Sequence, residues 1–229
     1  MLRFHTTEQP ERWSSLDEYV ASMKPDQKHI YYLLGDDDRS ALHSPHLDIV
    51  RHYGYPVLLL TDPVDAFLLV RLTKYKDFPL SNVATAELAL PESAQSAEGE
   101  ARPALDEQGA QGLIERFKAR LGEKVTDVRM TDRLADSPAR LVDPEGAPNQ
   151  EMQRVYRLLN REFEPPKKVL ELNPRHAILV RLGGLSAEDE RSALIIDQIY
   201  ENALLIEGLH PDPASMILRI QKIMESALK

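Results

Sequence analysis

The sequence contains no cysteine among its 229 residues, which excludes disulfide bonds and thiolate chemistry. This absence is consistent with a reducing cytoplasm, which is where we expect the protein to reside. No apolar run approaches the roughly 18 residues that a membrane-spanning helix needs. The first five residues also lack the apolar stretch of a secretory signal peptide, so neither an anchor nor a leader is expected.

Positive charge is in the minority, with 28 Lys and Arg residues against 37 Asp and Glu residues. The formal net charge of −9 argues against a nucleic-acid partner, because such proteins usually present a basic face to the phosphate backbone. It favours solubility and indicates little else about function.

Motifs for phosphate binding and for nucleophilic catalysis are also missing. Neither Gly-x-Gly-x-x-Gly nor Gly-x-x-x-x-Gly-Lys occurs, and no serine stands in a Gly-x-Ser-x-Gly elbow. The aspartates at 36–38 have the chemistry for a hard cation, but such a run is more often a solvated loop. His43 and His46, with His52 nearby, lack the third ligand that zinc needs. We therefore expect no metal and no catalytic residue here.

The first 84 residues are predicted to alternate strands and helices. Ser15 and Glu18 are spaced as a capping box, which predicts a short helix after Ser15. Buried strands are predicted at residues 29–34 and 57–60. Further helices are predicted after the Ser-Pro pair at 44–45 and the Asp-Pro pair at 62–63. This order indicates an α/β unit with parallel strands.

An enzyme or ligand-binding domain at residues 1–84 is the alternative function. It would need a polar cluster at the carboxyl ends of the strands. Those ends carry Gly-Asp-Asp at 35–37 and Thr-Asp-Pro at 61–63, and neither supplies a glycine-rich cradle for phosphates.

Residues 85–109 differ in composition from the rest, with proline, serine and glycine among acidic residues. Large apolar residues are scarce there, which predicts an acidic linker or a weak helix. We therefore expect one domain at residues 1–84 and a second at residues 110–229.

The second domain is predicted to mix helices and strands. A helical stripe of Leu113, Phe117 and Leu121 ends at Gly122. Strands are expected at residues 125–130 and around 141–142. Further helices are expected at 150–163, after the Asn-Pro pair at 173–174, across 194–206, and after the Asp-Pro pair at 212–213.

The last two of these helices predict a homodimer. Residues 193–206 are apolar on more than one face, and the final helix carries a long apolar stripe. A helix pair from a second copy would cover both, as in a four-helix bundle. The expected interface comprises Ile195, Ile199, Leu205, Met216, Ile220, Ile223 and Met224. The alternative is that both helices pack only on their own domain.

Several segments, in order, resemble the family of 90-kDa heat-shock chaperones. The first half carries Ser-Leu-Asp-Glu-Tyr-Val at 15–20, Ile-Tyr-Tyr at 30–32, Ser-Pro-His-Leu at 44–47 and Val-Leu-Leu-Leu-Thr-Asp at 57–62. The second half carries Val-Thr-Asp-Val-Arg at 125–129, Asp-Ser-Pro-Ala at 136–139 and Glu-Leu-Asn-Pro-x-His at 171–176. The chain lacks the Met-Glu-Glu-Val-Asp tail of eukaryotic cytosolic members, so it is most similar to the bacterial branch.

The resemblance implies the last part of the family's middle domain followed by its C-terminal dimerisation domain. The expected fold is α+β overall: a small α/β (αβα) subdomain, then a mixed α/β C-terminal domain ending in a helical dimerisation bundle. In the family, ATP and Mg bind an N-terminal domain, and a catalytic-loop arginine lies earlier in the middle domain. We therefore expect a piece of a longer ATP-dependent chaperone, without a cofactor of its own. Its expected partners are a second copy and unfolded or partly folded clients, but no tetratricopeptide cochaperone.

The predicted helix at 150–163 is amphipathic and lies between proline-containing breakers, which favours an apolar face that is not fully buried. The resemblance implies that this helix projects into the cleft between protomers and contacts clients. It also aligns Phe67 with an aromatic client contact, which is often tryptophan in bacterial relatives. The predicted client-binding residues are Phe67, Met152, Val155, Tyr156 and Leu159. The alternative is that Phe67, Met152 and Tyr156 are ordinary core residues.

Overall fold

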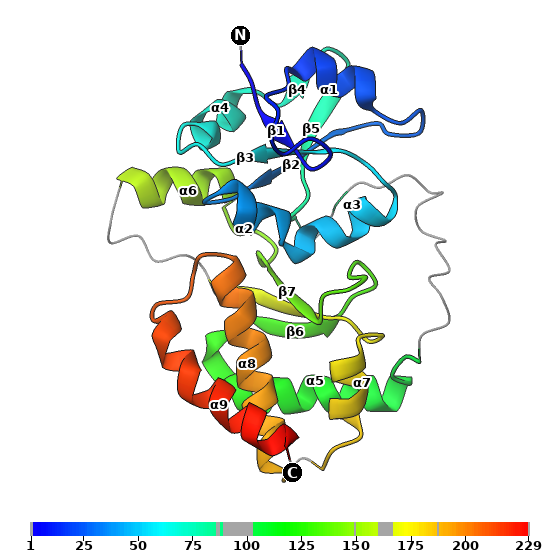
Figure 1. Cartoon of the computed structure of the whole chain (residues 1–229), viewed down its shortest axis with the longest axis vertical. Helices are drawn as coiled ribbons and strands as arrows, with labels where there is room; N and C mark the ends of the chain where they lie inside the picture. Colours follow the sequence, from blue (N-terminus) through cyan, green and yellow to red (C-terminus); the bar gives the residue numbers. More distant parts are fainter. Residues whose placement is uncertain are drawn as a thin grey trace. The chain divides into compact units, whose positions relative to one another are not determined.

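The computed structural model describes residues 2–85, 88, 103–148, 150–159, 167–186 and 188–228, without the side chains of Arg157 and Leu158. These residues belong to two compact units (Figure 1). The first comprises residues 1–98 and 143–166, and the second comprises residues 99–142 and 167–229. Most of the predicted linker at 85–109 lies outside the described residues. The expected boundaries at 84 and 110 stay predictions, but residues 143–166, expected in the second domain, group with the first unit.

The first unit is built on a five-stranded sheet in the order β1-β3-β2-β5-β4. Its strands are β1 (His5–Thr6), β2 (Ile30–Leu34), β3 (Val57–Leu60), β4 (Lys74–Tyr75) and β5 (Phe78–Asn82). The central strand β2 runs parallel to β3 and to β5, which confirms the parallel pair predicted at 29–34 and 57–60. The edge strands β1 and β4 pair antiparallel and were not predicted, since two residues each show no periodicity.

Helices cover both faces of this sheet, which makes the αβα arrangement that was expected. They are α1 (Leu16–Ser22), α2 (Asp38–Leu42), α3 (Asp48–His52), α4 (Asp65–Arg71) and α6 (Gln150–Leu159), with a 3-10 turn at Pro45–Leu47. Alternate residues of β2 and β3 enter two cores. Tyr31 and Leu59 face α2 and α3, whereas Ile30 and Leu58 face α1 and α4.

Local side-chain bonds explain where two of these helices begin. The capping box predicted at Ser15 is present, because the Glu18 amide donates to the Ser15 hydroxyl and the Glu18 carboxylate accepts from the Ser15 amide. The aspartates at 36–38 were expected in a solvated loop, which holds for Asp36 and Asp37, whereas Asp38 is the first residue of α2. The Asp37 carboxylate accepts from the amides of Arg39 and Ser40 and starts α2.

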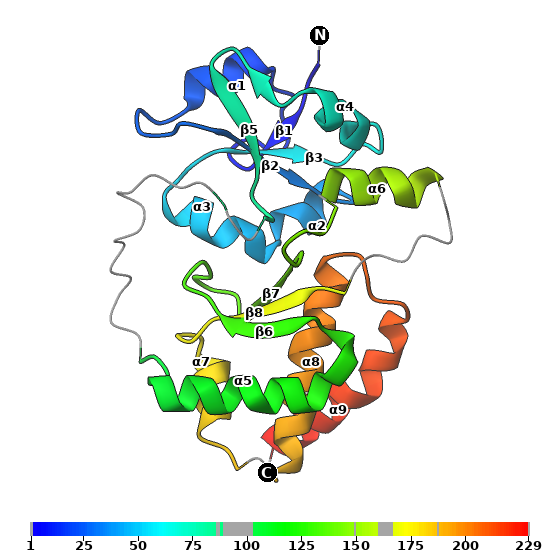
Figure 2. The same ribbon diagram turned by 180° about the vertical axis from the view of Figure 1, so that it is seen from behind.

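The second unit consists of a three-stranded sheet with helices on one face, as Figure 2 shows for α5. Its elements are α5 (Glu107–Leu121), a 3-10 turn (Gly122–Lys124), β6 (Asp127–Met130), β7 (Ala139–Val142), β8 (Val169–Leu172), α7 (Ala177–Gly183), α8 (Glu190–Ile206), a second 3-10 turn (Pro213–Ser215) and α9 (Met216–Ala227). Strand β8 is central, parallel to β6 and antiparallel to β7. One core joins Phe117 of α5, Leu170 of β8 and Ile196 of α8.

The sequence predicted most of these elements but missed the central strand. β8 has four residues and a glutamate within it, so its apolar pattern is too short to read. The helix expected after the Asn-Pro pair at 173–174 begins only at Ala177, where the His176 side chain caps it by accepting from the Ile178 amide. The Asn173 side chain bonds the carbonyls of Ala135 and Ser137 and the amide of Arg175. Within the ranges that the structure describes, no helix combines the length and apolarity needed to cross a bilayer.

Candidate functional site

All five residues predicted to bind clients lie in the first unit. Phe67 is on α4, the others are on α6, and these two helices pack against each other (Figures 1 and 2). Segments far apart in the sequence are therefore neighbours in the fold. The family resemblance had aligned Phe67 and α6 with client contacts separately, and sequence reasoning had placed them in different domains.

Exposure divides this set. The side chains of Phe67, Tyr156 and Leu159 are 44%, 42% and 72% exposed, whereas Val155 is buried and Met152 is partly buried. Val64, which directly precedes α4, and Val70 on α4 are exposed as well. We call the exposed apolar side chains Val64, Phe67, Val70, Tyr156 and Leu159 the α4–α6 surface. Val155 belongs to the protein interior rather than to this surface.

Polar contacts attach α6 to the sheet. The buried Glu151 carboxylate accepts a hydrogen bond of 2.6 Å from the Tyr32 hydroxyl and one of 2.9 Å from the Asn82 side-chain amide. Burial and the negative charge of Glu151 raise the pKa of Tyr32 far above its ordinary value. Arg154 donates to the Gly35 carbonyl at 2.6 Å and lies 3.2 Å from the Asp36 carboxylate. The sequence carries no signal for these contacts, because charged residues on an amphipathic helix usually face solvent.

The residues predicted to dimerise lie on α8 and α9 of the second unit. Leu205, Ile220 and Met224 are exposed, and Ile195 and Ile223 are partly buried. Ile199 and Met216 are each only 4% exposed and lie within the chain's own packing. Their part in a dimer interface stays a prediction, because helical periodicity does not tell an internal contact from an external one.

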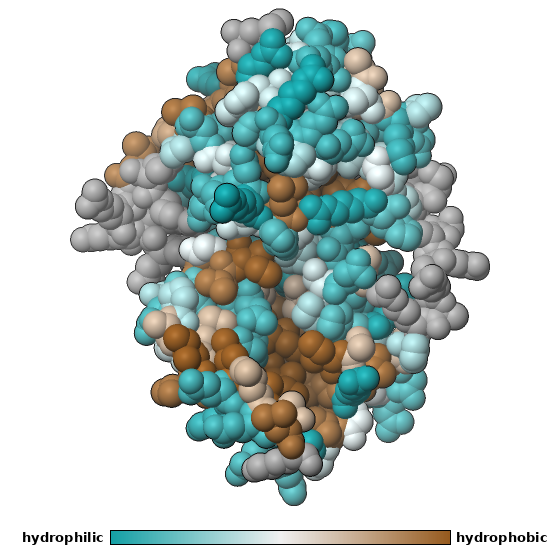
Figure 3. Space-filling model, in the orientation of Figure 1, coloured by the Kyte–Doolittle hydropathy of each residue, from teal (hydrophilic) through white to brown (hydrophobic). Residues whose placement is uncertain are grey.

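Four further apolar side chains on and beside these helices are exposed and were not predicted. Together with the exposed residues above they define what we call the α8–α9 surface: Leu205, Ile206, Ile217, Leu218, Ile220, Met224 and Leu228. Figure 3 shows apolar atoms gathered over α9 and the adjoining part of α8. Exposed apolar patches on this scale are typical of protein-binding surfaces.

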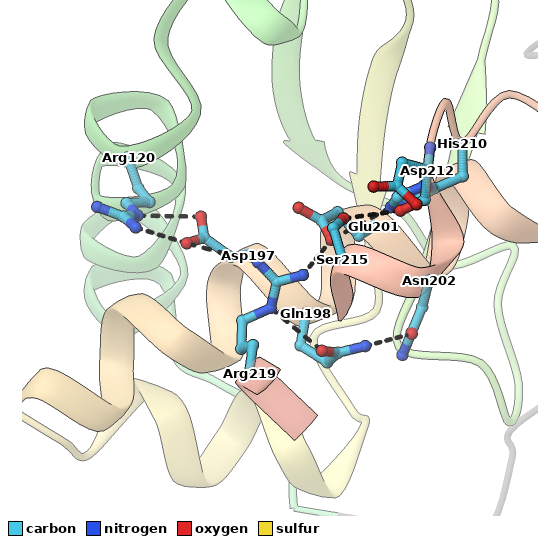
Figure 4. Close-up of polar contacts among 9 residues, drawn as sticks. All are labelled: Arg120, Asp197, Gln198, Glu201, Asn202, His210, Asp212, Ser215 and Arg219. Atoms are coloured by element: carbon cyan, nitrogen blue, oxygen red, sulfur yellow. Dashed lines mark hydrogen bonds and ion pairs between the residues drawn. The ribbon is translucent and has the colours of Figure 1, made fainter. Parts of the chain in front are cut away.

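Ion pairs position α9 on α8 (Figure 4). Arg219 of α9 donates to the Glu201 carboxylate of α8 and to the Gln198 side chain, the latter at 3.2 Å. His210 lies 3.2 Å from the same glutamate. Burial alone would raise the pKa of Glu201, but the hydrogen bonds from Arg219 and His210 outweigh it and lower that pKa. The network therefore holds Glu201 in its charged form.

A second charged cluster crosses the three-stranded sheet. Strand register places Arg129, Glu171 and Arg140 in one row, with Glu171 in the middle. Glu171 accepts from Arg129 at 2.7 Å and from Arg140 at 2.7 Å, and the Arg140 side chain is fully buried. Burial acts to raise the pKa of Glu171, but the arginines more than offset it and lower that pKa. This cluster stabilises the three-stranded sheet of the second unit.

The described residues include no group of three or more His, Asp or Glu side chains placed to hold a metal ion. Of the aspartates considered for a cation, Asp37 caps α2. Asp38 contacts His5 and accepts a hydrogen bond of 2.9 Å from Thr61. The candidate functional sites of the described residues are therefore two apolar surfaces, the α4–α6 surface and the α8–α9 surface. Polar contacts help to hold the helices of each.

Comparisons with known proteins agree on one family. The family model described as Hsp90 protein matches residues 1–229. The chain is 40% identical over 228 residues to the Chaperone protein HtpG of Paraburkholderia xenovorans, which covers 98% of this chain and 35% of that protein. It is 38% identical to the protein of the same name from Alcanivorax borkumensis, and 34% identical to that from Oleidesulfovibrio alaskensis. These matches cover 100% and 99% of this chain, and 36% and 37% of the relatives. The chain thus spans about a third of the length of the curated relatives it matches.

Proposed function

Because the chain belongs to the Hsp90 protein family, we propose that it joins two copies of a chaperone through the α8–α9 surface and binds unfolded or partly folded clients on the α4–α6 surface. The dimerisation proposal is carried by the number of large apolar side chains that α9 leaves exposed on a helix already held in place by Arg219. A matching helix pair from a second copy is the occupant that covers such a face symmetrically. A cytoplasmic location is part of the same proposal.

The test of dimerisation is sedimentation velocity at micromolar concentration. Wild-type chain is expected to sediment as a dimer, and Ile220→Asp as a monomer, because a carboxylate placed in an apolar interface loses its hydration. Gln221→Asp is the matched control, since Gln221 is exposed and polar on the same helix. A monomeric wild-type chain would contradict the proposal.

Client binding is supported by the neighbouring positions of Phe67 and α6, which carry exposed aromatic side chains from two helices of one unit. Aromatic side chains supply large contact areas, and tyrosine suits a surface that is wet on one side. An apolar surface of this kind fits the apolar segments that an unfolded chain exposes.

The test of client binding uses reduced, carboxymethylated α-lactalbumin with a fluorophore, a protein that cannot refold, and measures anisotropy. Phe67→Ser combined with Tyr156→Ser is expected to weaken binding about tenfold, or about 1.4 kcal/mol. The free energy of unfolding should change by less than about 0.5 kcal/mol per site, because both side chains are exposed. Ile178→Ser removes an exposed apolar side chain from α7 and is the control that should change neither quantity. Unchanged affinity in the double variant would count against the proposed surface.

ATP hydrolysis in the family is proposed to depend on residues outside this chain. ATP with Mg²⁺ is then expected to leave the melting temperature of the chain unchanged, because only a ligand of the folded state raises it by mass action. A melting temperature that rises with ATP concentration would contradict this.

A further inference from the structure

Helix α6 is attached to the first unit without entering its hydrophobic cores. Both cores of that unit draw their residues from the sheet, from α1 to α4 and from the segments that join them, and no described α6 side chain belongs to either. Among the described α6 side chains, Val155 is the buried apolar one. The attachment combines packing against α4 with polar contacts of Glu151 and Arg154. A helix held in this way can leave without dismantling a core.

The Glu151 contact balances two opposing effects. Its carboxylate accepts from two neutral donors, the Tyr32 hydroxyl and the Asn82 amide, and is only 5% exposed. Each hydrogen bond favours the docked helix, whereas the loss of hydration by a buried charge favours release. When α6 leaves, the carboxylate regains water and Tyr32 loses an acceptor. The buried charge therefore offsets part of the stabilisation that the two hydrogen bonds give to the docked helix.

Docking also divides the apolar stripe of α6. Met152, Val155, Tyr156 and Leu159 follow helical spacing and share one face. In the docked helix Val155 is buried and Met152 partly buried, so only the Tyr156 and Leu159 part of the stripe is open. Release would open the whole stripe and the side of α4 that α6 covers.

From these observations we propose that α6 is a reversibly docked helix, that Glu151 and Arg154 form its latch, and that the latch restricts access of clients to Met152 and Val155. The inference rests on the proposed client binding and adds its regulation. Clients bind the released helix more tightly, so the apparent affinity is reduced by the fraction of molecules that are docked.

Amide hydrogen exchange of residues 150–159, followed by mass spectrometry on the full chain, measures the latch directly. Glu151→Ala removes both acceptor contacts and should speed exchange across α6 several-fold. Glu151→Gln is the matched control: it keeps an acceptor oxygen and removes the buried charge, so exchange should be no faster than in wild type. Tyr32→Phe removes only the hydroxyl on the sheet side and should act in the same direction as Glu151→Ala, with a smaller effect.

Anisotropy with the same carboxymethylated α-lactalbumin measures the consequence. Glu151→Ala should bind this client several-fold more tightly than wild type, and Glu151→Gln should not.

Unchanged α6 exchange in both Glu151→Ala and Tyr32→Phe would overturn the latch. Faster exchange with equal or weaker client binding would overturn the restriction of access. If Phe67→Ser with Tyr156→Ser weakens binding while Glu151→Ala has no effect, the proposed function stands and this inference fails. If neither the wild-type chain nor any variant binds the client, the proposed function and the restriction of access both fail, and the exchange measurement tests only the docking of α6.

Discussion

The two units attach their peripheral helices by different kinds of contact. In the second unit, α9 is attached through an arginine to a glutamate whose charged form is favoured, and a buried ion-pair row stabilises the sheet. In the first unit, α6 is attached through a buried carboxylate with neutral donors, and through an arginine that bonds a backbone carbonyl and pairs with the exposed Asp36 carboxylate. Opposite charges suit an element that presents a permanent interface, whereas a carboxylate among neutral donors suits a helix that is released. The contacts that attach each helix thus agree with the role proposed for its surface.

The largest effect is expected where the second unit depends on charge. Glu171→Ala leaves the fully buried Arg140 guanidinium without its carboxylate partner, which should destabilise the chain by about 3–5 kcal/mol. Urea unfolding measures the loss. Replacing Glu171 and Arg140 together by apolar residues of similar size should recover much of the stability, because no unpaired charge remains. A loss below about 1 kcal/mol in the free energy of unfolding of Glu171→Ala would show that the ion-pair row of Glu171 contributes little to stability.

A smaller effect is expected at the attachment of α9. Arg219→Ala removes hydrogen bonds to Glu201 and Gln198, and charge-assisted bonds of this kind contribute about 1.5–3 kcal/mol each at most. We expect a loss of about 1–2 kcal/mol in the free energy of unfolding and a weaker dimer in sedimentation velocity. Lys222→Ala, an exposed position of α9, is the control and should change stability by less than about 0.5 kcal/mol. If Arg219→Ala dimerises as strongly as wild type, the dimer interface does not depend on the Arg219–Glu201 ion pair.

The smallest effect is a pH dependence of opposite sign in the two units. The folded-state pKa of Glu201 lies below its ordinary 4.5, so its stabilisation is complete above that pH and is lost as the pH falls further. Burial raises the pKa of Asp65 on α4 above its ordinary 3.8, so its charged form destabilises the fold at neutral pH, and acid removes that penalty.

Two matched variants test this difference by urea unfolding at a series of pH values. Glu201→Gln should be less stable than wild type at pH 7, and the gap should close below about pH 4.5. Asp65→Asn should be at least as stable as wild type at pH 7, with its advantage disappearing in acid. If the stability difference from wild type changes with pH in the same direction for both variants, the two units do not differ in this respect.

Much of the fold was predictable from local sequence. The capping box at Ser15 predicted α1, and the apolar segments around Tyr31 and Leu58 predicted parallel strands. Gly122 correctly marked the end of α5. These features were readable because each depends on residues within one or two turns of chain. The ordered motifs over nearly the whole chain also identified the family, which the comparisons confirmed.

The candidate surfaces were less predictable, because helical periodicity shows that a face is apolar but not what covers it. Ile199 and Ile220 look equivalent in sequence, yet one is core and the other is exposed. Glu151 reads as a solvent-facing residue, and its burial depends on Tyr32 and Asn82, which are distant in the chain. Only folding brings these groups together.

The sequence by itself therefore determined the elements with local signals and the family to which their order belongs. The tertiary structure decided that β8 is the central strand of its sheet, that α6 packs with α4, and which half of each apolar stripe is exposed. The physical reason is the range of the interactions involved. Capping and periodicity act between neighbours in the chain, whereas burial of Glu171 or Val155 depends on partners that only the folded chain places beside them.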